Sequence, residues 1–375
     1  MSGLYIHVPF CLTRCTYCDF YSQTQLIHKE EYIKAVLREL EMRKDYLEGD
    51  VIETVYWGGG TPSLLQPADF EQVFNLINRY YTISSSPEIT LEANPDDMTD
   101  EYVAALRQLP FNRISMGVQS FHDAELRVLN RRHTAAQALR AIALCRQYGF
   151  SNLSIDLIYG LPDQSLIKWE ENLDTAISLQ LPHLSAYCLS YEEGTALSQQ
   201  LQSGLLNPVE EDTIIQMFNI LIDKLEASGY IHYEISNFSR PECYSRHNTS
   251  YWMDRKYIGI GPSAHSYDLE SRQWNIASLP DYLEGIAKGI PNIEKEYTDE
   301  RTGYNEYLMT RLRTGRGIGL TEFAEKFGQE RLSVLLTEAS PFLKDGMMEN
   351  DDDRLRIARK GMMTADGLIR NLMEV

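Results

Sequence analysis

The eight-residue stretch CLTRCTYC carries Cys11, Cys15 and Cys18 in a C-x3-C-x2-C pattern. Zinc sites usually take four ligands from two paired half-sites, and no second Cys or Cys/His pair stands at a suitable spacing. Three neighbouring thiolates suit a cubic iron–sulfur cluster better, and they leave one iron open to an exchangeable ligand. We therefore expect a [4Fe–4S] cluster. A zinc site completed by His7 or His28, or simple packing of three thiols, are the alternatives.

The rest of the first half alternates short β-rich runs with longer helical patterns. The predicted strands cover 4–8, 54–57, 88–92, 113–118, 152–158 and 183–189, and the predicted helices cover 28–46, 67–81, 100–108, 123–129, 134–148, 169–179 and 210–228. Six βα units in series require a parallel sheet with right-handed crossovers. The pattern predicts an α/β fold, either an open doubly wound sheet or a complete or partial barrel.

Polar groups gather where the predicted strands end, on the face where such folds place their active sites. After the cysteines come the segments 58–62 (GGGTP), 92–95 (EANP) and 119–120 (QS), and Asp156 lies inside an apolar strand. A glycine-rich turn is often only a turn, and a lone strand Asp is often a satisfied core acid. Because these polar groups all lie at the carboxyl ends of neighbouring strands, together they predict a ligand site.

These residue types fit a small zwitterionic nucleoside. Glycines let the backbone approach an ammonium or a carboxylate closely. Glu92 offers an anion for the ammonium, and Gln119 and Asp156 offer hydrogen bonds to ribose hydroxyls. Arg131 offers a bidentate fork for a carboxylate, although the basic run 131–133 could instead be a solvated patch.

The cysteine pattern, with Tyr17 before the last cysteine and the GGGTP segment after it, resembles the radical S-adenosylmethionine (radical SAM) superfamily. The similarity runs from Tyr5 to about Asp156 and continues through the GPSAH segment, 261–265, into the C-terminal region. Within the superfamily the chain looks like the oxygen-independent coproporphyrinogen III oxidase group, and most like its haem-chaperone branch.

The resemblance implies a partial (β/α)6 TIM-like barrel with specific roles for the motif residues. Three cysteines, Cys11, Cys15 and Cys18, would hold a [4Fe–4S] cluster whose open iron SAM chelates. The implied SAM site comprises Tyr5, Tyr17, Gly59, Gly60, Thr61, Glu92, Gln119, Arg131 and Asp156. The resemblance leaves open whether SAM is cleaved reductively.

Three departures separate the chain from the oxidase pattern. The oxidase has a further Cys two residues after the last ligand, where this chain has Phe20, and a longer segment ahead of the cluster. Residues 247–252 (HNTSYW) match the HNxxYW signature of the chaperone branch, whose His is implicated in haem binding. This implies a haem site at His247, Tyr251 and Trp252. Without the resemblance, a packed loop with a satisfied His is the plainer interpretation.

The implied function is to bind haem and deliver it to haem-requiring proteins. Respiratory, membrane-associated proteins are among the candidate acceptors, and a homodimer is compatible with the sequence. The alternatives are a coproporphyrinogen III dehydrogenase, which the departures disfavour, and a zinc-stabilised binding protein. We expect the protein in the cytoplasm or at the inner face of the membrane, since we find no signal peptide and no apolar run of about 18 residues.

Composition narrows the partners further. The 375 residues include 35 Lys and Arg against 54 Asp and Glu, a net charge of −19, which repels nucleic-acid phosphates. A helix at 320–328 and a hairpin at 346–360 resemble a winged helix, but the acidic run 349–353 would stand at the wing tip. We therefore expect no nucleic-acid binding.

Three regions are predicted. Residues 1–235 form the barrel, 236–298 a loop-rich bridge with the HNxxYW motif, and 299–375 a small, mostly helical C-terminal domain of the winged-helix type. Two cysteines outside the cluster motif, Cys145 and Cys188, are expected to be inert core thiols.

Overall fold

The computed structural model describes residues 2–351 and 353–374. Six parallel strands lie side by side in chain order and form the predicted partial barrel. They are β1 (Ser2–Val8), β2 (Ile52–Gly59), β3 (Ile83–Ala93), β4 (Arg113–Gln119), β5 (Asn152–Tyr159) and β6 (His183–Cys188). The fold class predicted from the βα rhythm is therefore confirmed.

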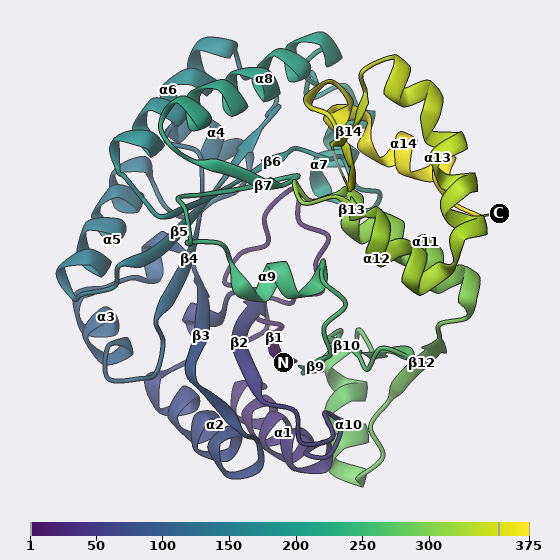
Figure 1. Cartoon of the computed structure of the whole chain (residues 1–375). Helices are drawn as coiled ribbons and strands as arrows, with labels where there is room; N and C mark the ends of the chain where they lie inside the picture. The colour runs from purple at the N-terminus through teal and green to yellow at the C-terminus, as the bar shows by residue number, and fades with distance from the viewer. Residues whose placement is uncertain (1, 352, 375) are drawn as a thin grey trace.

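Helices surround the outer face of these strands (Figure 1). They are α1 (Lys29–Met42), α2 (Pro67–Tyr80), α3 (Asp100–Leu106), α5 (Ala135–Gln147), α6 (Leu166–Ser178) and α8 (Glu211–Ala227). The short helices α4 (Asp123–Val128) and α7 (Ala196–Gln202) instead contact Thr16 of the cysteine loop, at the carboxyl end of the strands. Two short 3-10 turns, η1 (Pro62–Leu64) and η2 (Pro95–Asp97), follow β2 and β3. Side-chain caps begin several helices, such as Thr134 before α5, which accepts a hydrogen bond from the Gln137 amide.

The barrel strands alternate between an apolar outer face and a polar inner face, because successive side chains of a strand point to opposite sides. In β1, Leu4, Ile6 and Val8 are fully buried in the core, while Tyr5 and His7 point inward. The inward set on β2 to β5 includes Thr54, Tyr56, Glu88, Glu92, Arg113, Ser115, Ser154 and Asp156. The barrel interior is therefore lined by groups that can bind a polar ligand.

The segment 236–298, predicted to be rich in loops, instead extends the sheet at both edges. On one side β8 (Asn237–Ser239) pairs antiparallel with β6, and β7 (Ile231–Glu234), which lies just ahead of the segment, pairs antiparallel with β8. On the other side β9 (Tyr257–Ile260) pairs parallel with β1, and β10 (His265–Tyr267), β11 (Ser271–Asn275) and β12 (Ile293–Tyr297) follow antiparallel. Among the described residues the sheet has twelve strands, with α10 (Leu279–Lys288) packed on α1.

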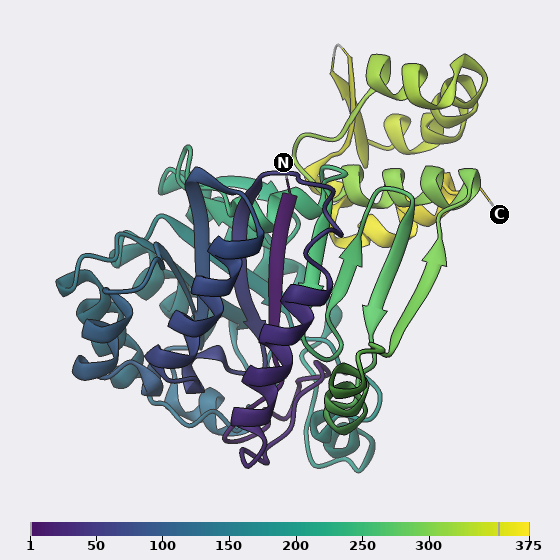
Figure 2. The same cartoon turned by 90° about the horizontal axis from the view of Figure 1, so that it is seen from below.

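The HNxxYW motif forms a short helix, α9 (Arg246–Tyr251), across the end of the barrel where β1 and β2 begin (Figure 1). The side chain of His247 lies next to Gly3 and Thr54, the residues near the starts of these strands. The cysteine segment follows the other end of β1, so the two motifs occupy opposite ends of the barrel (Figure 2).

The C-terminal region has its own hydrophobic core, centred on Tyr307, Phe323 and Leu355. Its elements are α11 (Glu300–Leu312), β13 (Ile318–Gly319), α12 (Leu320–Phe327), α13 (Gln329–Lys344), β14 (Met348–Asp351), β15 (Arg354–Ile357), η3 (Arg359–Thr364) and α14 (Ala365–Leu372). The predicted helix and hairpin are both present, and this region lies at the same end of the barrel as the N-terminus (Figure 2).

The expected acidic run lies on the hairpin. Two of its carboxylates, Glu349 and Asp351, pair with Arg356 on the neighbouring strand, while Asp352 lies outside the described residues. Elsewhere in the described chain, no helix combines the length and apolar character needed to span a membrane.

Candidate functional site

A cavity of about 420 Å³ opens at the carboxyl ends of the barrel strands. Every residue predicted for the cluster and for SAM lines it, except Tyr5, which lies deeper in the barrel. The predicted residues at the cavity are Cys11, Cys15, Tyr17, Cys18, Gly59, Gly60, Thr61, Glu92, Gln119, Arg131 and Asp156. The structure thus brings together side chains that are far apart in the sequence, which is the first requirement for one ligand site.

The three predicted cluster cysteines are free thiols at this cavity. The Thr61 hydroxyl donates to Cys11 Sγ at 3.5 Å, and Arg131 Nη1 donates to Cys15 Sγ at 3.3 Å. Burial raises the pKa of Cys18 to about 11. Three thiols at one opening, one of them hydrogen-bonded to a guanidinium, are a donor set that fits an iron–sulfur cluster.

The two histidines considered for a zinc site are engaged elsewhere. The ring nitrogens of His7 lie 3.1 Å from the Tyr5 hydroxyl and 2.9 Å from the carbonyl of Tyr21. His28 lies 2.7 Å from Glu31 on α1, and neither histidine lines the cavity. The donor set at the cavity therefore favours the cluster over the zinc alternative.

Two half-buried carboxylates, Glu92 and Asp156, line the cavity. Glu92 accepts a 2.7 Å hydrogen bond from Tyr56 and a 3.2 Å bond from the Gly59 amide, and burial raises its pKa to about 7. Burial also raises the pKa of Asp156. Among the described residues neither carboxylate forms an ion pair, so a cationic ligand would relieve the cost of burying them.

The glycine segment passes directly over the cysteine loop. Gly59 has a φ of +105°, and a Cβ there would lie 2.6 Å from the His7 ring. A Cβ on Gly60 would lie 2.7 Å from the Phe10 carbonyl and 3.1 Å from Cys11 Sγ. Only glycine fits this approach, which keeps backbone N–H and C=O groups open to a ligand.

Arg131 points into the cavity and is not part of a solvated patch. Its Nη2 donates to Asn94 Oδ1 and to the Gly117 carbonyl, both at 2.6 Å. Its Nε is buried and has no hydrogen-bond partner in the described part of the chain. The neighbouring Arg132 pairs instead with Asp96 at 2.7 Å. A fixed guanidinium with one unused donor fits a carboxylate ligand.

Gln119 is held in an unusual backbone conformation, with a φ of +67° after a bulge in β4. The next residue, Ser120, donates a 2.6 Å hydrogen bond to the buried Glu125. Gln164 and Asn172 also donate to the same carboxylate oxygen, at 3.1 and 3.2 Å. We did not predict this network, because a single Glu in a short helix gives no sign that it is buried.

Cys188 also lines the cavity, and so corrects our expectation of an inert core thiol. It is exposed at the end of β6 beside Tyr187, which is 43% exposed. The other cysteine predicted to be inert, Cys145, is buried on α5. The period-two alternation of β6 gives no signal for Cys188, because both Tyr187 and Cys188 are exposed: their pairing with β5 continues, but the pairing with β8 ends at Ser185.

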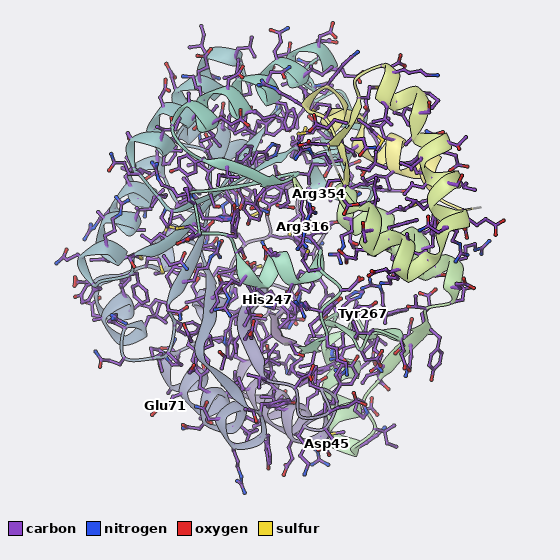
Figure 3. The ribbon with its side chains drawn as sticks, in the orientation of Figure 1. Asp45, Glu71, His247, Tyr267, Arg316 and Arg354 are labelled. Atoms are coloured by element: carbon purple, nitrogen blue, oxygen red, sulfur yellow. The ribbon has the colours of Figure 1, made fainter. Side chains whose placement is uncertain are left out.

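The predicted haem residues lie away from this cavity. His247 is 1% exposed, and its Nδ1 and Nε2 lie 2.7 Å from Thr54 Oγ1 and 2.8 Å from the Tyr251 hydroxyl. Burial lowers its pKa to about 3, so the ring is neutral. Figure 3 labels His247 on α9, near the middle of the barrel end. Trp252 ends the helix.

Aromatic rings connect this end to the cavity. The His247 ring stacks on Tyr56 at 4.8 Å and on Tyr5 at 6.4 Å. Tyr5 in turn hydrogen-bonds His7, under the glycine segment. Tyr5, predicted to lie beside SAM, thus occupies the layer between the two motifs.

Comparison with known proteins gives consistent results. A model described as the radical SAM superfamily matches residues 5–176, and a model of the HemN C-terminal domain matches residues 299–364. The haem chaperone HemW of Mycobacterium tuberculosis is 33% identical over 99% of this chain and 94% of its own length. HemW of Bacillus subtilis is 32% identical over 97% of both chains. The structure of coproporphyrinogen III oxidase (HemN) from Escherichia coli covers 99% of this chain and 90% of its own, with a TM-score of 0.86 at 22% identity.

Proposed function

The chain belongs to the HemW family of the radical SAM superfamily, and on that premise we propose that it binds haem and transfers it to proteins that require haem. The observation that carries the proposal is the similarity to proteins named haem chaperones over nearly the whole chain, motif helix and C-terminal domain included. The similarity in fold to HemN is equally complete, but at 22% identity it supports the fold alone.

The cavity would hold the cofactors. We assign Cys11, Cys15 and Cys18 to a [4Fe–4S] cluster, with Tyr17, Gly59, Gly60 and Thr61 around it and the methionine part of SAM. Glu92 would bind the SAM ammonium, Arg131 its carboxylate, and Gln119 and Asp156 the ribose, with Tyr5 packed below. When bound, a cluster of this kind with SAM supplies one-electron chemistry.

The protein's own contribution at this site is electrostatic. Glu92 and Asp156 offer negative charge and Arg131 offers positive charge at half-buried positions of one cavity, where water screens charge less than at an open surface. A zwitterion whose charges match this arrangement binds in one orientation only. The glycine segment contributes close contact, since no side chain stands between the backbone and the ligand.

The haem site would form around His247, with Tyr251 and Trp252 beside it. A neutral imidazole is a common iron ligand, and burial keeps this one neutral. Both of its nitrogens are hydrogen-bonded in the described arrangement, so binding to iron requires that Tyr251 or Thr54 release it.

Tyr56 connects the two sites, since its hydroxyl bonds Glu92 and its ring stacks on His247. This supports a role for SAM and the cluster in binding or releasing haem. We further propose haem-requiring acceptors in the cytoplasm or at the inner face of the membrane, respiratory proteins among them, and a homodimer as the assembly to test.

The test uses anaerobically reconstituted protein. The haem-loaded protein is mixed with the apo form of a haem protein, and in parallel coproporphyrinogen III is supplied with SAM and a reductant. Haem transfer without decarboxylation is the expected result. Turnover to protoporphyrinogen without a specific haem spectrum would instead identify a coproporphyrinogen III dehydrogenase. A colourless protein that contains zinc would identify the zinc-stabilised binding protein.

A further inference from the structure

We propose that Arg311 of the C-terminal domain is a positioning residue for the haem-binding helix: it holds α9 closed against the barrel, and haem reaches His247 only when this contact opens. The proposal rests on the proposed function for the role of His247. The closed arrangement itself is visible in the contacts at both ends of the helix.

The barrel holds the first turn of α9. The Glu88 carboxylate accepts hydrogen bonds from the amides of Arg246 and His247, at 3.1 and 2.9 Å. These amides have no partner within the helix, and a carboxylate at a helix N-terminus also favours the local dipole. Thr54 adds its 2.7 Å contact with the ring of His247. The imidazole is thereby kept inside the barrel.

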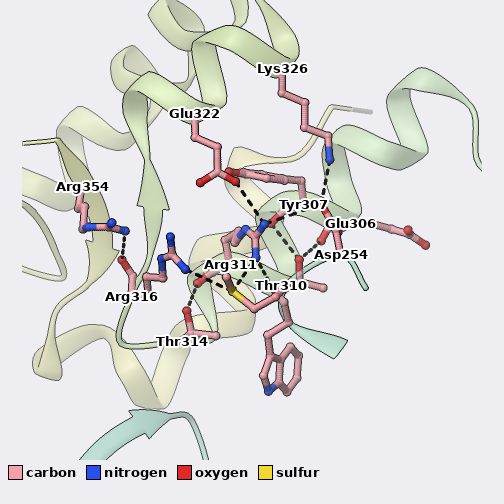
Figure 4. Close-up of polar contacts among 12 residues, drawn as sticks. Asp254, Glu306, Tyr307, Thr310, Arg311, Thr314, Arg316, Glu322, Lys326 and Arg354 are labelled. Carbon is pink, nitrogen blue, oxygen red and sulfur yellow. Dashed lines mark hydrogen bonds and ion pairs between the residues drawn. The ribbon is translucent and has the colours of Figure 1, made fainter. Parts of the chain in front are cut away.

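The C-terminal domain holds the other end (Figure 4). Arg311, on α11, is almost fully buried and donates to the carbonyl of Trp252 at 2.6 Å and to Met253 Sδ at 2.9 Å. Its guanidinium lies 5.0 Å from the centre of the Tyr307 ring. Asp254, the next residue along the motif segment, pairs with Lys326 at 2.8 Å. The start of the HNxxYW motif is thus bound to the barrel, and its last residue and the two residues that follow are bound to the C-terminal domain.

Arg311 is the strongest of these outer contacts. A hydrogen bond from a buried guanidinium to a carbonyl is charge-assisted, whereas Lys326 is 47% exposed and its ion pair contributes little. Removing Arg311 takes this donor from the carbonyl of Trp252, the residue that caps α9, and leaves the Met253 thioether only its 3.9 Å contact with Arg316 Nη1. Opening of α9 should then become easier while the barrel is unchanged.

The C-terminal domain does not depend on Arg311 for its attachment. The amide of Ile235 donates to the Arg313 carbonyl at 3.0 Å, and the amide of Gly315 donates to Tyr233 at 3.0 Å. On the far side of the domain Arg359 pairs with Asp223 on α8 at 2.6 Å. Arg359→Gln is therefore a matched control: it breaks a contact between the domains that does not touch α9.

The experiment compares the full-length protein with its Arg311→Gln and Arg359→Gln variants. Amide hydrogen exchange in residues 246–254 is measured without haem, and haem affinity is measured by spectral titration. Because apparent affinity scales with the fraction of molecules that are open, both quantities should rise by the same factor in Arg311→Gln, about tenfold for the loss of one charge-assisted bond. Arg359→Gln should change neither.

Unchanged exchange in Arg311→Gln, or faster exchange with weaker haem binding, would overturn the proposal. If Arg311→Gln does not fold, Thr54→Val tests the same closed state from the barrel side, since it removes a hydrogen bond from His247 at nearly constant volume. Failure of the proposed function gives a different pattern: exchange rises in the variant, but His247→Ala binds haem as well as the wild type does.

Discussion

The ring of Tyr56 lies 4.8 Å from the ring of His247, at an angle of 24° between the two planes. The Tyr56 hydroxyl donates a 2.7 Å hydrogen bond to Glu92. One side chain therefore contacts both the proposed ligand of haem and the proposed ligand of the SAM ammonium. The cysteine motif and the HNxxYW motif lie at opposite ends of the barrel, and Tyr56 connects the two ends through the interior of the barrel.

Tyr56→Phe keeps the ring and removes the hydrogen bond to Glu92. SAM affinity should fall about tenfold, because a hydrogen bond to a charged group is lost. In the wild type, SAM and haem should change each other's affinity by the same factor, as linkage requires, and this factor should approach one in the variant. Calorimetric titration of each ligand with and without the other measures it. An identical factor in both proteins would contradict the coupling.

SAM binding should strengthen as the pH rises through 7. Burial raises the Glu92 pKa from 4.5 to about 7, so without ligand the protonated form is favoured in the folded state. The protonated Glu92 carboxyl therefore stabilises the folded state fully below pH 4.5, and this contribution to the free energy of unfolding is lost as the pH rises to about 7. An ammonium needs the ionised form, so SAM affinity should be about tenfold weaker at pH 6 than at pH 8.

Glu92→Gln is the control for this pH dependence, because the amide has no charge to titrate. The variant should bind SAM weakly and equally at both pH values. If the pH dependence of SAM affinity persists in the variant, another titrating group causes it. Glu234 would be the first group to examine, because burial also raises its pKa to about 7.

Glu125 should control SAM binding through Gln119. Glu125→Gln keeps a carbonyl oxygen for the three donors but replaces the carboxylate by a neutral amide, which weakens all three hydrogen bonds and should lower the free energy of unfolding by about 2 kcal/mol. SAM affinity should fall with it, because the positive φ of Gln119 is no longer enforced. Gln119→Gly keeps that backbone conformation without the amide and should weaken SAM binding with little loss of stability. Denaturant unfolding and SAM titration measure both; SAM affinity unchanged in Glu125→Gln would make the network purely structural.

Of the four cysteines at the cavity, three should bind the iron–sulfur cluster and one should not. Serine at Cys11, Cys15 or Cys18 should abolish iron incorporation and the brown colour of the reconstituted protein. Cys188→Ser should retain both, although Cys188 lines the same cavity. Iron and sulfide content per chain is the measurement. Loss of iron in Cys188→Ser would contradict the assignment of the cluster.

The βα core was predictable because its signals are local. Apolar alternation within each strand, caps such as Thr134 and the order of the units all lie within a few residues of one another, and the strand ends at Gly59, Glu92 and Gln119 therefore marked one rim. The cavity brought these residues together as the parallel topology requires.

The bridge and the haem motif could not be placed in this way. Strands β8 to β11 have three to five residues each, and they are strands because the edges of the sheet accept them, not because of their own pattern. The position of His247 depends on Glu88 and Thr54, which are more than 150 residues away in the sequence. No local signal reveals that the motif closes the end of the barrel opposite the cysteines.

The most direct test of the account compares His247→Ala with His183→Ala in a haem titration. Both histidines are buried in the barrel and bonded to a hydroxyl on each side, His183 to Ser154 and Tyr233, both at 2.7 Å. The two variants should therefore lose similar stability. We predict that haem affinity falls at least tenfold in His247→Ala alone. Equal haem affinity in the two variants, or loss in His183→Ala only, would contradict the proposal that this chain carries haem on His247.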